Sequence, residues 1–67
     1  MINYGEALKN QRESSGLTQL ELANATNIKQ QNISRWELNQ AVPNIDFCVK
    51  LADYYGITLD ELVGRDK

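Results

Sequence analysis

Side chains that can form paired hydrogen bonds gather in a short run between Lys29 and Leu38. If this run is helical, a rotation of about 100° per residue brings one set of them within an arc of roughly 140°. That set comprises Gln30, Gln31, Ser34, Arg35 and Leu38. Glutamine amides and arginine guanidinium groups can each bond a purine edge at two points in the major groove of DNA. The pattern therefore favours base recognition, although a solvated surface would have a similar composition.

The opposite side of the same predicted helix is apolar. Ile33 and Trp36 are three residues apart and so share one helical face. Asn32 lies at the edge of that face, and its role stays open. Trp36 could in principle stack on single-stranded bases. A lone aromatic residue at this spacing is more often part of a core, and we expect Trp36 to be buried.

A second short helix, predicted at about 19–25, precedes the first across a tight turn. Together they resemble the helix-turn-helix of the phage repressor and Cro family of transcription regulators. Ala23 matches the small residue where the two helices touch, and Asn27 matches the turn position that is usually glycine. Ile33 and Trp36 match the apolar residues that hold the recognition helix. The resemblance extends over about residues 4–63.

The resemblance implies two kinds of DNA contact. The positions matching the family's groove-facing residues are Lys29, Gln30, Gln31, Ser34 and Arg35. The positions predicted to contact phosphates are Thr18, Gln19, Asn39 and Gln40. Thr18 and Gln19 begin a helix, where free amides and a partial positive charge favour anions. Gln40 departs from the lysine or arginine common in the family, and an uncharged amide releases no counterions.

Arg12 and Glu37 match a family pair that joins the first helix to the end of the recognition helix. Glu37 falls on the inward arc, which is unfavourable for a carboxylate unless it is paired. We therefore expect a partly buried ion pair that fixes the tilt of the recognition helix. The alternative is a solvated Glu37.

The rest of the chain predicts an all-α fold, a compact bundle of five short helices in one domain spanning residues 1–67. The helices are expected at about 4–15, 19–25, 29–38, 45–55 and 59–63, with the helix-turn-helix formed by the second and third. Thr-x-x-Glu capping boxes mark two of the starts, at Thr18 and Thr58. In the fourth helix, a helical period predicts core positions at Ile45, Cys48, Leu51, Ala52 and Tyr55.

Length and composition exclude several other classes of protein. Sixty-seven residues allow one small domain. A single cysteine and no histidine leave neither an internal disulfide nor a usual zinc site. We expect no cofactor, no metal and no enzymatic activity, because no catalytic arrangement is present. No apolar run is long enough for a membrane span, and no secretory signal is evident, so a cytoplasmic protein is expected.

The net charge of −2 argues against nucleic-acid binding, but the charges are unevenly placed. Acidic residues concentrate in the last third, whereas Lys29 and Arg35 lie on the proposed reading helix. We expect modest affinity per monomer and therefore a homodimer, whose contact the resemblance and surplus apolar residues place at Ile57, Leu59 and Val63.

The leading hypothesis is a sequence-specific regulator of transcription, most simply a repressor that binds double-stranded DNA at a near-palindromic operator. One alternative is a protein-interaction module of the same fold that has lost DNA binding. Another is an antitoxin or restriction-control regulator, which would use the same helix on DNA.

Overall fold

Five α-helices follow one another in the computed structural model, which describes residues 3–65. They are α1 (Tyr4–Ser14), α2 (Gln19–Thr26), α3 (Gln30–Glu37), α4 (Ile45–Tyr55) and α5 (Leu59–Val63). The predicted all-α fold of five short helices, with the helix-turn-helix in α2 and α3, is thereby confirmed. Residues 1–2 and 66–67 of the predicted domain lie outside the described part. Within residues 3–65, no helix is both long and apolar enough to cross a membrane.

Four of the five helices begin at a side chain that accepts a hydrogen bond from the backbone. Thr18 accepts from the N–H of Glu21, whose carboxylate accepts from the N–H of Thr18 in return, and Thr58 and Glu61 repeat this reciprocal pair. The other two caps, at α1 and α4, are Asn3 and Asn44. Each such cap contributes about 1 kcal/mol to stability. The α3 helix is the exception, because Lys29 offers no acceptor.

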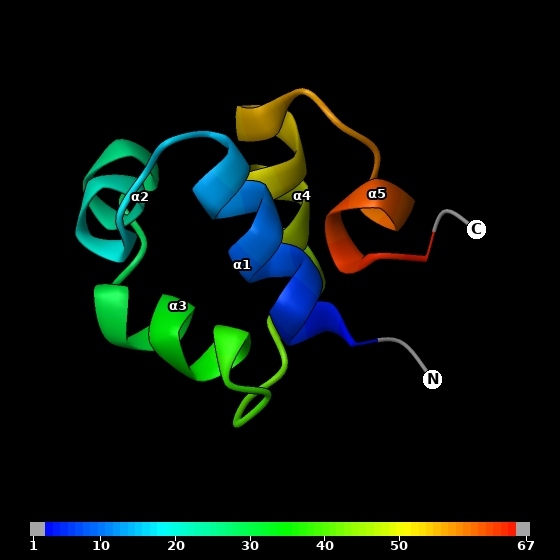
Figure 1. The fold of residues 1–67 in the computed structure, drawn as a ribbon, viewed down its shortest axis with the longest axis horizontal. Coiled ribbons are helices and arrows are strands. Elements are labelled where there is room, and N and C mark those ends of the chain that lie inside the picture. Colours follow the sequence, from blue (N-terminus) through cyan, green and yellow to red (C-terminus); the bar gives the residue numbers. More distant parts are fainter. Residues whose placement is uncertain (1–2, 66–67) are drawn as a thin grey trace.

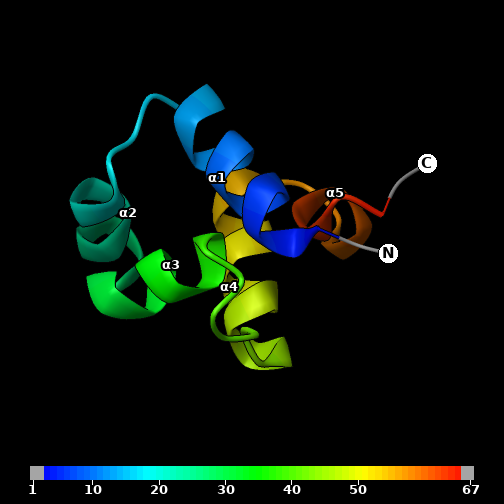
Figure 2. The same cartoon turned by 60° about the horizontal axis from the view of Figure 1, so that its bottom comes forward.

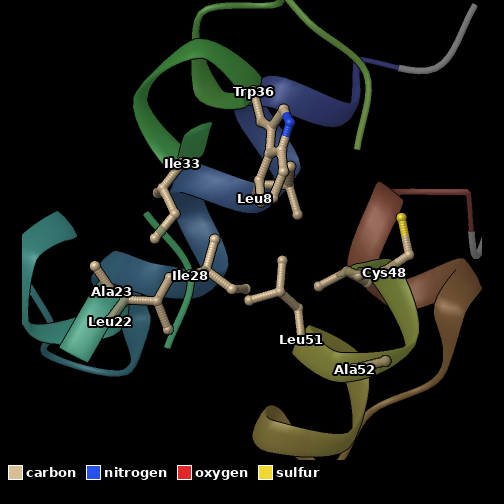
Figure 3. Close-up of a cluster of buried hydrophobic side chains, with 10 residues drawn as sticks. Leu8, Leu22, Ala23, Ile28, Ile33, Trp36, Cys48, Leu51 and Ala52 are labelled. Atoms are coloured by element: carbon tan, nitrogen blue, oxygen red, sulfur yellow. The ribbon is translucent and has the colours of Figure 1, made fainter. Parts of the chain in front are cut away.

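The core lies between α1, α4 and the helix-turn-helix, and α5 closes it. Figure 1 shows α2 and α3 on one side of the long helices α1 and α4, with α5 on the other; the turned view in Figure 2 keeps the same arrangement. Buried side chains from all five helices, and Ile28 from the turn between α2 and α3, meet there (Figure 3): Leu8, Leu22, Ala23, Ile28, Ile33, Trp36, Cys48, Leu51, Ala52 and Leu62. This shared core fixes where α3 lies.

Ile45 was predicted to face this core, and that prediction is wrong. Its side chain is 64% exposed. Cys48, Leu51 and Ala52 define the buried arc of α4, and Ile45 lies about 70° from the centre of that arc by helical geometry. Because Ile45 is also the first residue of α4, there is no preceding turn of that helix to cover it.

Candidate nucleic-acid interface

The turn between α2 and α3 sets the angle of α3. Asn27 adopts the left-handed conformation, with φ of 58°, and Ile28 then enters the core with only 3% of its surface exposed. Asparagine tolerates this backbone conformation better than most residues with a side chain. Ala23, which is 7% exposed, presents only a methyl group within the core. The chain therefore leaves α2 and re-enters the protein at a fixed place before α3 begins.

Two apolar residues hold the inner side of α3. Ile33 is 2% exposed and Trp36 is 5% exposed. The Trp36 ring packs against Phe47 of α4 with ring centroids 5.1 Å apart. Trp36 therefore lies inside the protein and is not available as a stacking platform on the surface.

The outer side of α3 carries the residues predicted to read bases. Lys29, Gln30, Gln31 and Arg35 are exposed, and Ser34 is partly exposed. Within residues 3–65, no hydrogen bond or ion pair engages the side chains of these five residues. An open hollow lies beside them and is lined by Gln19, Lys29, Gln30, Gln31 and Ser34. The structure thus brings four of the five predicted base-reading residues together with Gln19 at one concave surface, and Arg35 lies exposed on α3 outside its lining.

An ion pair locks the inner edge of α3 to α1. The Nε of Arg12 donates to Oε2 of Glu37 at 2.7 Å, and its second terminal nitrogen donates to Oε1 at 3.0 Å. The two side chains are only 10% and 4% exposed. The hydrogen bond to Glu37 raises the pKa of Arg12. The third donor of the guanidinium reaches the carbonyl of Leu17 at 2.8 Å, so α1 and the loop before α2 share one anchor with α3.

Gln19 joins this anchor through a contact that the sequence analysis missed. Its Nε2 donates to Oε1 of Glu37 at 2.9 Å. A glutamine amide nitrogen carries two hydrogens, and no other residue in the range 3–65 accepts the second, which can therefore be donated to a phosphate. The neighbouring Thr18 uses its hydroxyl oxygen to cap α2 and keeps its own O–H hydrogen. Both predicted phosphate contacts at the start of α2 are thus held in place and still able to donate.

At the far end of α3, Asn39 serves a purpose that the sequence analysis did not foresee. Its Oδ1 accepts from the N–H of Gly5 at 3.1 Å, and its Nδ2 donates to Oδ1 of Asn3 at 3.1 Å. Its backbone, with φ of 59°, ends the helix in a left-handed turn. The Asn39 side chain therefore joins the end of α3 to the start of α1 through two hydrogen bonds. Gln40, also predicted to contact phosphate, remains exposed.

Gly5 makes this close approach of α1 to the end of α3 possible. A Cβ at position 5 would lie 2.6 Å from the carbonyl oxygen of Glu37 and 2.7 Å from Oδ1 of Asn39. Such distances are too short for any residue other than glycine. A signal for this contact was present in the sequence, because a glycine inside a predicted helix costs about 1 kcal/mol relative to alanine and usually has a packing reason.

The three residues predicted to form a dimer contact differ in exposure. Leu59 is 39% exposed, whereas Ile57 and Val63 are partly buried, and Ile57 packs against the core. Leu59 is therefore the member of this set that has most surface free for a partner.

This arrangement, two short helices joined by a tight turn with the second presenting polar side chains outward from an all-α core, defines a helix-turn-helix domain. The family model described as helix-turn-helix matches residues 8–62. The chain belongs to this helix-turn-helix family, in the phage repressor and Cro group that the sequence analysis named.

The relatives of this chain are named as regulators of transcription. The chain is 35% identical over 66 residues to the HTH-type transcriptional regulator ImmR of Bacillus subtilis, an alignment that covers 98% of this chain and 52% of ImmR. It is 35% identical over 60 residues to the cryptic phage CTXphi transcriptional repressor RstR of Vibrio cholerae, covering 90% and 54%. The chain spans about half the length of these two relatives.

A solved structure shares the fold. The solution structure of the SOS-response transcriptional repressor LexA from Eubacterium rectale superposes with a TM-score of 0.84 at 30% identity, over 96% of this chain and 68% of that one. The likeness therefore extends over nearly all of the present chain.

Proposed function

We propose that this protein is a regulator of transcription that binds double-stranded DNA at a specific sequence, with α3 in the major groove. One observation carries the proposal. The side of α3 that bears Gln30, Gln31 and Arg35 is exposed, while its opposite side is buried through Ile33 and Trp36. Glutamine amides match adenine and the guanidinium of arginine matches guanine, each through two hydrogen bonds. The names of the relatives ImmR and RstR support this role.

Phosphate contacts would set the position of α3 in the groove. Thr18 and Gln19 border the free backbone N–H groups at the start of α2, a favourable place for a phosphate. At the other end of α3, Gln40 is exposed and could donate to the backbone of the DNA. The side chain of Asn39 is engaged by Asn3 and Gly5, so its second Nδ2 hydrogen is the donor that it would offer.

Selection of bound sequences from a random DNA pool tests the proposal directly. The wild-type protein should enrich one motif. Gln31→Ala and Arg35→Ala should each relax the preference at one base position and cost about 1–3 kcal/mol of binding free energy. Lys9→Ala is the matched control, because Lys9 is an exposed cation on α1. If both α3 variants select the wild-type motif with unchanged affinity, the assigned reading face is wrong.

We also propose that the protein acts as a homodimer on a near-palindromic operator, and the repressor RstR among its relatives suggests repression as the outcome. One recognition helix covers only a few base pairs, and a two-fold pair of them doubles the interface. The exposed Leu59, with Val63 beside it on α5, supports a contact there.

Leu59→Asp should shift the protein toward monomer in analytical ultracentrifugation, whereas Val42→Asp, also at an exposed position, should not. Equal behaviour of the two variants would move the contact away from α5.

A protein-interaction module of the same fold is the second candidate, favoured by the net charge of −2 and the uncharged Gln40. A gel shift at low salt with random duplex separates the two candidates. Because electrostatic attraction to phosphates dominates at low salt, a DNA-binding domain should retain measurable affinity there. No shift, together with tight capture of one protein, would favour the second candidate.

A further inference from the structure

One side chain on the outer side of α3 has no hydrogen-bonding group. Leu38 follows the last residue of the helix and is 63% exposed. Its backbone N–H still donates to the carbonyl of Ser34 at 3.1 Å, as in a helix, with φ of −91° and ψ of 4°. Its side chain therefore leaves the backbone in nearly the direction that one more helical residue would give.

The position of Leu38 around the helix places it among the predicted base-reading side chains. An exposed leucine alone is ordinary on a protein surface. At about 100° per residue, however, Leu38 lies about 20° from Gln31 and about 40° from Ser34. Gln31, Ser34, Arg35 and Leu38 thus occupy positions i, i+3, i+4 and i+7. A helix lying in the major groove can present side chains at this spacing to bases, as the third helix of homeodomains does.

The distance from Gln31 to Leu38 along the helix would also let the two side chains reach different base pairs. The rise from Gln31 to Leu38 is about 10 Å at 1.5 Å per residue. Base pairs are about 3.4 Å apart along the duplex, so Leu38 would lie at most about three base pairs beyond the base nearest Gln31. The side chain would then meet a part of the groove that the glutamines cannot reach.

Chemistry restricts what Leu38 can recognise there. Its side chain neither donates nor accepts hydrogen bonds. The apolar group that bases present in the major groove is the C5-methyl of thymine. We propose that Leu38 is a specificity-determining residue that selects thymine by packing against this methyl group. The inference rests on the proposed function and adds a base preference that Gln31 and Arg35 do not supply.

The test replaces each thymine of the selected duplex, one at a time, by deoxyuridine, which removes only the methyl group. One thymine in each half-site should be sensitive, with affinity for the wild-type protein falling about fourfold, the worth of one buried methyl group. Leu38→Ala should bind the thymine and uracil duplexes nearly equally. Leu38→Gln, which has similar length and a polar end, should also lose the sensitivity. Both variants should fold normally, because Leu38 lies largely in solvent.

Val42→Ala is the matched control, because Val42 is an apolar residue 76% exposed in the following loop. It should keep the wild-type sensitivity to uracil. The inference is overturned if no thymine is sensitive, or if the Leu38 variants remain as sensitive as the wild type. It is also overturned if Val42→Ala abolishes the sensitivity, which would assign the contact to the loop. Failure of the wild-type protein to bind any duplex is a different result, and it would contradict the proposed function itself.

Discussion

Removing one partner of the Arg12–Glu37 pair should destabilise the protein strongly. The carboxylate of Glu37 accepts two bonds from Arg12, at 2.7 and 3.0 Å, and its side chain is 4% exposed. Arg12→Met would leave this buried charge with the amide of Gln19 as its remaining donor among the described residues. Stranding one member of a buried pair costs about 3–5 kcal/mol. A chain of this length has a total stability of only about 3–10 kcal/mol, so the variant should be close to unfolded.

Glu37→Gln should have a smaller effect than Arg12→Met. The amide of the variant could still accept one bond from Arg12, whose guanidinium also keeps its bond to the carbonyl of Leu17 at 2.8 Å. The double variant Arg12→Met with Glu37→Leu removes both charges and should cost less than the sum of Arg12→Met and Glu37→Leu measured singly. The difference between that sum and the double variant measures the coupling.

Urea unfolding followed by tryptophan fluorescence measures these costs. Trp36 is the single tryptophan, is 5% exposed, and lies next to Glu37 in α3. A loss of 3 kcal/mol corresponds to a fall in Tm of roughly 12–24 °C for a domain of this size. If Arg12→Met and Glu37→Gln leave Tm unchanged, or if the effects in the double variant simply add, the pair does not hold α3 in the way described here.

Three further perturbations test other contacts. Gly5→Ala should lower stability by about 1–3 kcal/mol, because the new Cβ meets the carbonyl of Glu37 at 2.6 Å. Helix propensity alone predicts a gain in stability. The sign of the change in Tm therefore decides between a steric clash and helix propensity as the dominant effect. Tyr55→Phe should raise stability at neutral pH by about 1 kcal/mol, because the buried hydroxyl of Tyr55 has no hydrogen-bond partner among the described residues, and an equal or lower Tm would contradict this. Burial also raises the pKa of Tyr55 to about 12 from its ordinary 10. Between pH 10 and pH 12 this tyrosine deprotonates in the unfolded chain before it does so in the folded protein, so the wild type should lose stability over that range. Tyr55→Phe should lose less stability over the same range in urea titrations. Thr18→Ala should cost about 1 kcal/mol through loss of the α2 cap and should weaken DNA binding by more than Thr58→Ala, which removes the equivalent cap of α5; equal binding by the two variants would remove Thr18 from the phosphate contacts.

Local signals in the sequence were sufficient to predict most of the helices, whereas their arrangement as a helix-turn-helix was expected from the family resemblance. Capping boxes at Thr18 and Thr58 mark helix starts within a few residues, and the spacing of Ile33 and Trp36 identifies the buried side of α3. These signals succeed because each depends on neighbours within one or two turns. Ile45 shows where the approach fails, because exposure at the end of a helix depends on which other helices extend over it.

Contacts between distant residues were harder to predict. The bond from Gln19 to Glu37 spans 18 positions, and the approach of Gly5 to Asn39 spans 34. No periodicity links such residues, since their separation depends on how three helices pack together. The inward position of Glu37 indicated that it needs a partner, but Arg12 was identified as that partner only because the chain resembles a known family. The base, phosphate and dimer assignments stay predictions until the binding experiments are done.

Among the residues that the structure describes, none bonds to the outward side chains of α3, and this bears on how such a protein can change over evolutionary time. Ile33, Trp36, Glu37 and Asn39 keep the helix in place from behind and from its end. Exchanging Gln31 or Arg35 for another polar residue would leave that support untouched. Mutations could therefore redirect the domain to a new target without endangering its folding, so a duplicated gene could diverge in the DNA it recognises while the scaffold stays the same.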